Sequence, residues 1–255
     1  MGGPPGHPHR VFEDAFSGSA LDASKWNTYI TSRAASGSPW NSDGSDGSGM
    51  DQGGYDAEYF QASQVAVDNG LFLSAQRGSS RRGYSWTSGV VSTYGKFEFT
   101  GGYVQIAAKM PPGDGMWPGL WLLPGPGGSG GDNFEVDLFE GNYIGNGANP
   151  NDNAAWHLHT PAGTAGGVSD THTDLAAGFH VYGLDWVPGQ SVTWYLDGSE
   201  VGRVTSSQVP IPDEPMELIL DLQVANASAS GWITTADGST PSPSSMQVAE
   251  VQVYS

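Results

Sequence analysis

Short runs of β-favouring residues separated by turn residues constrain this chain more than any other feature. From Val65 onward they recur about every 8 to 14 residues, with Gly, Pro and Asn between them. The clearest case is 68–70, where an Asn-Gly turn joins residues 65–67 to residues 71–75, a strong signal for a β-hairpin. Long helical patterns are almost absent. The pattern therefore predicts an all-β chain rather than a helical bundle or an α/β barrel.

The expected strands form one continuous series, with no internal repeat and no linker that would divide it. They cover residues 11–16, 65–67, 71–75, 96–99, 103–109, 179–186, 191–196, 200–204, 217–224 and 246–254. Such spacing is typical of a sandwich of two antiparallel sheets. We expect residues 1–10 to be a flexible N-terminal segment and residues 11–255 to form one domain. Residues 36–54, rich in Gly, Ser and Asp, predict either a flexible surface loop or the rim of a ligand cleft.

Net charge limits the partners of the chain. The 27 Asp and Glu residues against 9 Lys and Arg give a formal charge of −18. A field this acidic disfavours nucleic acid, whose phosphates need Lys and Arg contacts, and it disfavours anionic membranes. No apolar run approaches the roughly 18 residues of a membrane span, and residues 1–10 lack the apolar stretch of a signal peptide. With no cysteine, the chain cannot use thiol catalysis or Cys-ligated zinc.

Three acidic residues within six positions carry the densest chemistry. Side chains alternate along a strand, so Glu135 and Asp137 share one face. Glu140 joins them only if the strand contains one extra residue, a β-bulge, a device that often re-aims side chains beside active sites. Carboxyl groups about 5 to 6 Å apart are then within reach, the separation that a retaining glycosidase uses. The alternatives are ordinary surface acids or a calcium site.

Two tryptophans precede the acidic strand. Trp117 and Trp121 lie on the same face if their segment is extended, and aromatic faces of this kind stack on sugar rings. The alternative interpretation is that both belong to the core.

Two histidines follow the acidic strand. His157 and His159 share a face of the next run, whereas Trp156 and Leu158 take the other. The functional interpretation places His159 beside the carboxylates, where it tunes the acid. A histidine that is merely hydrogen-bonded is the alternative, and a zinc site would need a third ligand nearby. We expect no metal ligands here.

Several segments together resemble one family. The run Glu135-Val136-Asp137-Leu138-Phe139-Glu140 is similar to the E-x-D-x-x-E signature of glycoside hydrolase family 16, in the bulged form of laminarinase-like endo-β-1,3-glucanases. Other segments that resemble this family are residues 115–124, 179–186, 192–198 and 217–224. The likeness covers roughly residues 11–255.

The resemblance implies a fold and a mechanism. The fold is a β-jelly roll, a sandwich of two antiparallel sheets with an open concave substrate cleft. Glu135 would be the nucleophile of a retaining double displacement, and Glu140 would be the general acid/base. Asp137 would hold Glu135 and help to set its ionisation. Trp117 and Trp121 would line the sugar subsites, and His159 matches the histidine that ends the following strand in the family.

Two segments depart from the pattern of laminarinase relatives. Their late strand usually reads Leu-Asn-Leu-Ala-Val-Gly-Gly, whereas here Asp221 and Gln223 interrupt it. We expect both side chains to face the cleft and to alter the subsites. Relatives often supply an Asp from the last strand to a structural calcium, but the matching position here is Ala249, followed by Glu250.

The sequence thus predicts a retaining endo-glycosidase that hydrolyses laminarin-type β-1,3-glucan. The alternatives are the same chemistry on mixed-linkage glucan, a succinoglycan-type exopolysaccharide or a galactan, and a non-catalytic glucan-binding module. No cofactor is required, and a structural calcium is doubtful. A polysaccharide is the expected partner of a monomeric, secreted protein, because such a polymer does not enter the cell.

Overall fold

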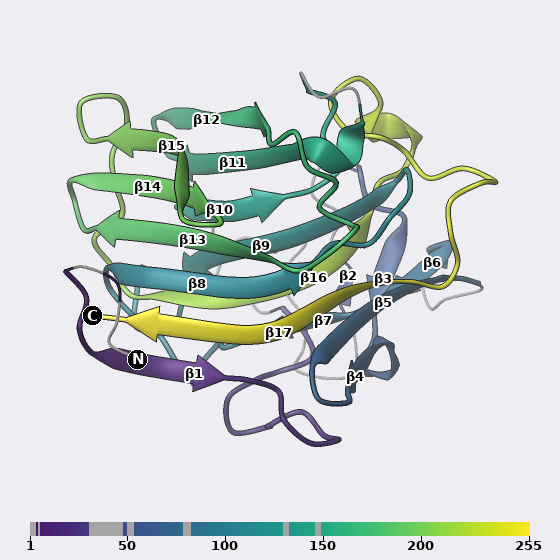
Figure 1. Cartoon of the computed structure of the whole chain (residues 1–255), viewed down its shortest axis with the longest axis horizontal. Coiled ribbons are helices and arrows are strands. Elements are labelled where there is room, and N and C mark those ends of the chain that lie inside the picture. The colour runs from purple at the N-terminus through teal and green to yellow at the C-terminus, as the bar shows by residue number, and fades with distance from the viewer. Residues whose placement is uncertain are drawn as a thin grey trace.

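Two layered β-sheets make up the computed structural model, which describes residues 4, 6–30, 48–49, 54–78, 83–129, 133–145 and 149–255 (Figure 1). The larger sheet has eleven strands. Its order is β15 (Ser199–Thr205), β14 (Ser191–Leu196), β13 (His180–Val187), β8 (Gly102–Lys109), β17 (Ser244–Tyr254), β5 (Leu71–Arg77), β6 (Trp86–Ser88), β3 (Glu58–Phe60) and β2 (Ser48–Gly49), with β1 (Arg10–Asp14) on β17 and β4 (Val65–Val67) on β5.

The smaller sheet has six strands and carries the acidic motif. Its order is β12 (Gly163–Asp170), β11 (Asn153–Thr160), β10 (Glu135–Glu140), β9 (Met116–Pro124), β16 (Met216–Val224) and β7 (Val90–Ser92). The short 3-10 helices η1 (Ala62–Gln64), η3 (Pro150–Asp152) and η4 (Ala227–Ala229) lie in connections. The predicted all-β sandwich is confirmed. Among the described strands, all pairings are antiparallel except β3 with β6.

Most of the predicted strands form, with boundaries that move by at most two residues. The hairpin at Asn69–Gly70 is confirmed: β4 pairs antiparallel with β5, and Asn69 adopts a φ of 47°. The strand expected at 96–99 is wrong, because this segment is a turn in which only Phe99 makes an isolated bridge, to Met216. Strand β12 was not predicted, since its Gly-rich sequence has weak strand propensity.

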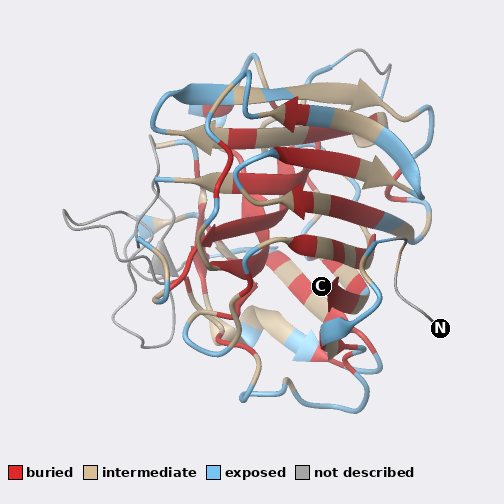
Figure 2. Cartoon of the chain, turned by 90° about the vertical axis from the view of Figure 1, so that its left-hand side faces the viewer, coloured by how far each residue is buried: buried red, intermediate tan, exposed pale blue. Residues whose placement is uncertain are grey.

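The hydrophobic core lies between the two sheets. Buried residues gather along the strands, and exposed residues concentrate in the connecting turns (Figure 2). All nine residues of β16 are buried: Leu218, Leu220 and Leu222 join the core between the sheets, whereas Ile219 belongs to a separate buried cluster. Because successive side chains alternate, Glu217, Asp221 and Gln223 face away from the main core, together with Ile219. The six-stranded sheet therefore presents polar groups on its outer face.

The two ends of the described chain lie side by side. Strand β1 pairs with β17, and the backbone amides and carbonyls of His9 and Ser255 exchange hydrogen bonds of 3.2 and 2.8 Å. His7 Nε2 lies 3.3 Å from Asp185 Oδ1. In the described ranges, no helix has the length and apolar character to cross a membrane. Of the predicted loop 36–54, all but residues 48–49 and 54 lies outside the described residues.

Candidate active site

A β-bulge in β10 places three carboxylates on the outer face of the six-stranded sheet. Asp137 pairs with Trp121 of β9, and Phe139 pairs with the adjacent Leu120, so Leu138 is an extra residue. Leu138 and Phe139 both join the core between the sheets. Two consecutive side chains thus point inward, and Glu140 returns to the face of Asp137. The predicted bulge is confirmed.

A tryptophan from the opposite sheet fixes the backbone at this bulge. Trp194 of β14 is fully buried, and its Nε1 donates a 2.7 Å hydrogen bond to the carbonyl oxygen of Asp137. A bulge leaves a backbone group without a partner in the ladder, and a buried group of this kind is costly unless it is paired. The core of the sandwich therefore holds the carboxylates in place from behind.

Glu140 is surrounded by hydrogen-bond donors. Trp117 Nε1 and Tyr143 Oη donate to its Oε1 at 3.1 and 2.9 Å, and His157 Nδ1 lies 2.6 Å from its Oε2. Burial alone raises the pKa of this carboxyl. The hydrogen bond and charge of His157, with the bonds from Tyr143 and Trp117, outweigh burial and lower the pKa of Glu140 below its ordinary value.

Asp137 has the opposite electrostatic environment. Only 3% of the residue is exposed, and burial, reinforced by the charge of Glu140, raises its pKa well above the usual range of a carboxyl. A hydrogen bond with Glu135 and the charge of His157 act in the other direction without reversing the shift. Asp137 therefore keeps its proton to a higher pH than Glu140 does.

The two histidines divide between the carboxylates. His157 lies opposite Asp137 and bonds to Glu140, whereas His159 lies opposite Glu135. His159 Nε2 is 3.3 Å from Asp137 Oδ2 and 3.7 Å from Glu135 Oε1. The structure thus brings His159 beside the carboxylates as expected, but the imidazole that contacts Glu140 is that of His157.

The two predicted tryptophans differ in their surroundings. Trp117 is partly exposed, and its ring packs edge-on against Trp232, with ring centroids 5.1 Å apart. Trp121 is 3% exposed and donates a 3.1 Å hydrogen bond to Asp221 Oδ2. It belongs to a buried cluster that also contains Ile30, Phe60, Val90, Leu123 and Ile219. Of these two tryptophans, Trp117 is the one that is partly exposed to solvent.

The predicted Asp221 and Gln223 lie on the same face as the carboxylates and are buried. Gly119 pairs with Glu140 on one side and with Asp221 on the other. A Cβ at Gly119 would lie 2.6 Å from Asp221 Oδ1, so the absence of a side chain there makes room for the Asp221 carboxyl. Burial raises the pKa of Asp221 well above its ordinary value, against hydrogen bonds from Trp121 and Gln223.

Sequence reasoning missed several residues around the site. Glu58 of β3 is fully buried and accepts a 2.7 Å hydrogen bond from Val224 N. Burial raises its pKa well above the ordinary value, and the charges of Asp56 and Asp221 add to that shift. Asp56 and Glu58 share one face of the aromatic-rich run 55–60, and this pattern could have identified them from the sequence. Tyr143, three residues after Glu140, had no signal of its own.

One group of side chains in the described part of the chain could hold a metal ion. Asp137, His157 and His159 each offer a donor atom, and these atoms lie within 4.8 Å of one another. At the position expected for a structural calcium, Ala249 offers no side-chain ligand, and Glu250 Oε1 accepts a 2.6 Å hydrogen bond from Gln252 Nε2. These residues do not fit a calcium site, and we assign no role to calcium.

Comparisons with known proteins agree with this geometry. The family model "Glycosyl hydrolases family 16" matches residues 53–239. A β-glucanase of Rhodothermus marinus is 28% identical over 87% of this chain and 77% of its own length. Glucan endo-1,3-beta-glucosidase A1 of Niallia circulans is 28% identical over 96% of this chain, which spans only 37% of that relative. The crystallographic laminarinase of Rhodothermus marinus superposes with a TM-score of 0.76 at 26% identity, over 96% of this chain and 97% of that one.

Proposed function

Because the chain belongs to glycosyl hydrolases family 16, whose model matches well over half of it, we propose that it is a retaining endo-glycosidase that hydrolyses laminarin-type β-1,3-glucan. The observation that carries the proposal is the bulge of β10, which places Glu135, Asp137 and Glu140 on one face. Similar proteins named as glucanases and laminarinases support the choice of a glucan.

Within this proposal, Glu135 is the nucleophile. Its oxygen attacks the anomeric carbon, the glycosidic C–O bond breaks, and the departing oxygen receives a proton from Glu140. Water then attacks the glycosyl-enzyme, Glu140 accepts a proton from that water, and Glu135 is released. Asp137, which is hydrogen-bonded to Glu135, is placed to hold this side chain, and burial raises the pKa of Asp137 well above its ordinary value.

The acid proton is shared between Glu140 and His157. Burial lowers the pKa of His157, but its hydrogen bond to Glu140 and the charges of Glu140 and Asp137 outweigh burial and raise it. Between the lowered pKa of Glu140 and the raised pKa of His157, the pair therefore holds one proton, on the imidazole. The 2.6 Å contact between His157 Nδ1 and Glu140 Oε2 supports its transfer to Glu140 when a leaving group arrives.

A second candidate keeps this chemistry and changes the polymer. Asp221 and Gln223 stand in β16 on the face of the carboxylates, and Asp221 lies two strands away from Glu140, across Gly119. A carboxyl in this position favours different sugar contacts, so mixed-linkage glucan, succinoglycan-type exopolysaccharide and galactan are the alternative substrates. A glucan-binding module without catalysis is disfavoured by the paired glutamates and their hydrogen-bond partners.

The proposed substrate also suggests where the protein works. A polysaccharide is too large to enter the cell, so we propose a secreted protein that acts as a monomer on a polymer, without a required cofactor. Size-exclusion chromatography with light scattering checks the monomer.

The test is reducing-end release from laminarin, lichenan, succinoglycan and agarose. We expect release from laminarin that Glu135→Gln abolishes by several orders of magnitude, and a product whose first-formed anomer is β by NMR. Hydrolysis of another polymer alone would keep the carboxylate mechanism and assign the difference to Asp221 and Gln223. No release from any of the four polymers, or equal rates of release by wild type and Glu135→Gln, would overturn the proposal.

A further inference from the structure

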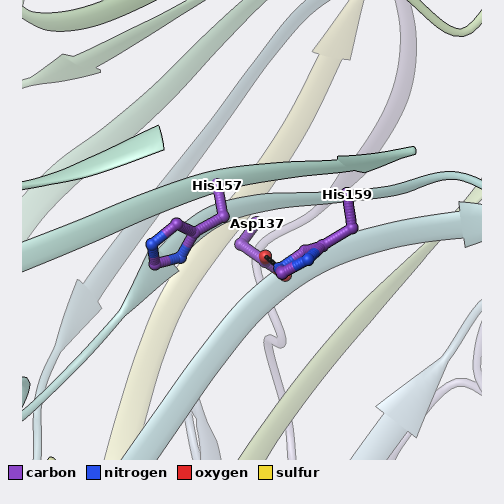
Figure 3. Close-up of side chains that lie close together, drawn as sticks. All are labelled: Asp137, His157 and His159. Carbon is purple, nitrogen blue, oxygen red and sulfur yellow. Dashed lines mark ion pairs between the residues drawn. The ribbon is translucent and has the colours of Figure 1, made fainter. Parts of the chain in front are cut away.

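Three nitrogen and oxygen donors converge from two neighbouring strands. Figure 3 shows the imidazole of His159, from β11, directed at Asp137 of β10, with His157 next to them on the same side of the sheet. Asp137 is paired with His157 in the strand register, and Glu135 is paired with His159. Since the strands are fixed by backbone hydrogen bonds, this arrangement is built into the sheet rather than dependent on a loop.

The spacing of these donors suits a tetrahedral metal ion. Zinc binds imidazole nitrogen and carboxylate oxygen at about 2.0 to 2.2 Å, so two neighbouring ligands of one zinc ion stand about 3.3 to 3.5 Å apart. His159 Nε2 and Asp137 Oδ2 are 3.3 Å apart. The donor atom of His157 lies within 4.8 Å of both, and a zinc ion bound here would draw it closer to the other two.

A neighbouring hydroxyl orients one of the imidazoles. His159 Nδ1 lies 2.9 Å from Thr164 Oγ1 on β12. When Nδ1 carries the proton and donates it to this hydroxyl, Nε2 presents a lone pair toward Asp137. Ligating histidines are commonly held in this way by a hydrogen bond to the other ring nitrogen.

An independent observation points to a positive ligand. Asp137 Oδ2 is buried and has no hydrogen-bond partner in the described part of the chain, although His159 lies nearby. Glu135 and Glu140 add two further carboxyl groups around the same point, in a chain whose formal charge is −18. In the described part of the chain, His157 and His159 are the bases that form ion pairs with these acids, so a dication would be stabilised here.

We propose that Asp137, His157 and His159 form an inhibitory binding site for a transition-metal dication of the zinc class. Two imidazoles and one carboxylate are the ligands that zinc prefers, whereas calcium and magnesium require cages of oxygen atoms. Glu135 Oε1, 3.7 Å from His159 Nε2, or a water completes the coordination. A bound ion neutralises the charge of the proposed nucleophile and blocks the sugar, so hydrolysis stops until the ion is removed.

Metal binding is measured without substrate, so its result is independent of the proposed hydrolysis. Zinc chloride is titrated calorimetrically into the protein, and cobalt(II) is added in parallel to record its visible absorption. We expect one zinc ion per chain, a tetrahedral cobalt spectrum, and binding at least about 10-fold weaker in His159→Asn. The matched control is His172→Asn, whose exposed imidazole lies outside the site and whose loss leaves the affinity unchanged.

The four histidines outside the proposed site, at positions 7, 9, 172 and 180, are still present in His159→Asn. If these histidines bound the zinc, the variant would keep the wild-type affinity. Asp137→Asn is the second variant, and circular dichroism verifies that both fold. Equal zinc affinity in wild type and His159→Asn, or equal affinity for calcium and zinc, would overturn the site. We also expect zinc to inhibit laminarin hydrolysis and EDTA to reverse this inhibition. A protein that binds zinc as expected but hydrolyses no laminarin would count against the proposed function alone.

Discussion

The phenol of Tyr143 donates a 2.9 Å hydrogen bond to Oε1 of Glu140, only three residues earlier in the chain. Asn142, between them, adopts a φ of 60°, which turns the chain back just after β10 ends. Trp117 donates to the same oxygen. The carboxylate of Glu140, the proposed acid/base, is therefore held by a side chain from its own turn and by another from β9.

Replacing the phenol of Tyr143 tests how much its hydrogen bond to Glu140 contributes to catalysis. Glu140 becomes an anion when it gives up its proton, and a hydrogen bond to a charged group contributes about 1.5 to 3 kcal/mol. We expect Tyr143→Phe to lower kcat/KM on glucan by about 10- to 100-fold with little change in folding. Steady-state kinetics measure this. Tyr195→Phe, on β14 of the other sheet, should match wild type, and a Tyr143→Phe enzyme with wild-type kinetics would remove Tyr143 from the site.

The two glutamates should respond differently to the quality of the leaving group. A general acid typically contributes about 10²- to 10⁴-fold, but an activated aryl leaving group needs no proton. We therefore expect Glu140→Gln to form the glycosyl-enzyme from a nitrophenyl glucan oligosaccharide at a near wild-type rate, seen as a burst of nitrophenol. Glu135→Gln should show no burst. The reverse pattern would exchange the roles of Glu135 and Glu140.

Gly166 of β12 leaves space for the imidazole that contacts Glu140. A Cβ there would lie 2.5 Å from His157 Cδ2 and 2.4 Å from the carbonyl oxygen of Trp156. We expect Gly166→Ala to displace His157, to reduce kcat at least about 10-fold, and to lower Tm. Kinetics and thermal unfolding are measured on the same preparation. In Gly178→Ala the new methyl meets nothing within 4 Å, so this control should retain activity.

Glu217 predicts a pH dependence of stability. It is fully buried in β16, and burial, helped by Glu98, raises its pKa well above the ordinary 4.5. The folded state then binds this proton more tightly than the unfolded chain, so the free energy of unfolding falls as pH rises above the unfolded pKa. Glu217→Gln removes that loss. We expect its Tm to exceed that of wild type at pH 7 by at least about 2 to 4 °C, the equivalent of 1 kcal/mol in a chain of this size.

The same comparison at pH 4 supplies the control. Below the unfolded pKa, Glu217 is neutral in the folded and in the unfolded wild-type chain, so the difference in Tm between wild type and Glu217→Gln should shrink. Glu200→Gln, at an exposed position of β15, should leave Tm unchanged at both pH values. A Glu217→Gln protein that gains nothing at pH 7 would show that this carboxyl is well solvated or paired in solution.

Local rules of the strand were sufficient to predict part of the site. Alternation places Glu135 and Asp137 together, and the need to bring Glu140 to them predicts the bulge that the structure contains. The shared face of His157 and His159 follows from the same rule. The hairpin at residues 68–70 follows from its turn chemistry. In each case the information lies within a few residues.

Contacts between distant segments were not predictable in this way. Which histidine meets Glu140 depends on how the bulge shifts β10 along β11, and alternation alone does not supply that shift. Trp121 shares the face of the carboxylates, but Phe60 and Val90 bury its ring, and these come from other parts of the chain. Glu58 approaches Asp221 only because β3 and β16 are brought together by the fold.

The extra residue in β10 can also be considered as an insertion. Without Leu138, the order Glu135, Val136, Asp137, Phe139, Glu140 would alternate regularly, with the three acids still on one face and Phe139 still against Tyr182 in the core. Loss of Val136 instead would send Glu135 and Asp137 to opposite faces. The bulge is thus the point where this strand can change length by one residue while keeping its acids together. Glu135 and Glu140 lie opposite His159 and Ala155, four steps apart on β11, so a regular strand of four steps would span the same distance.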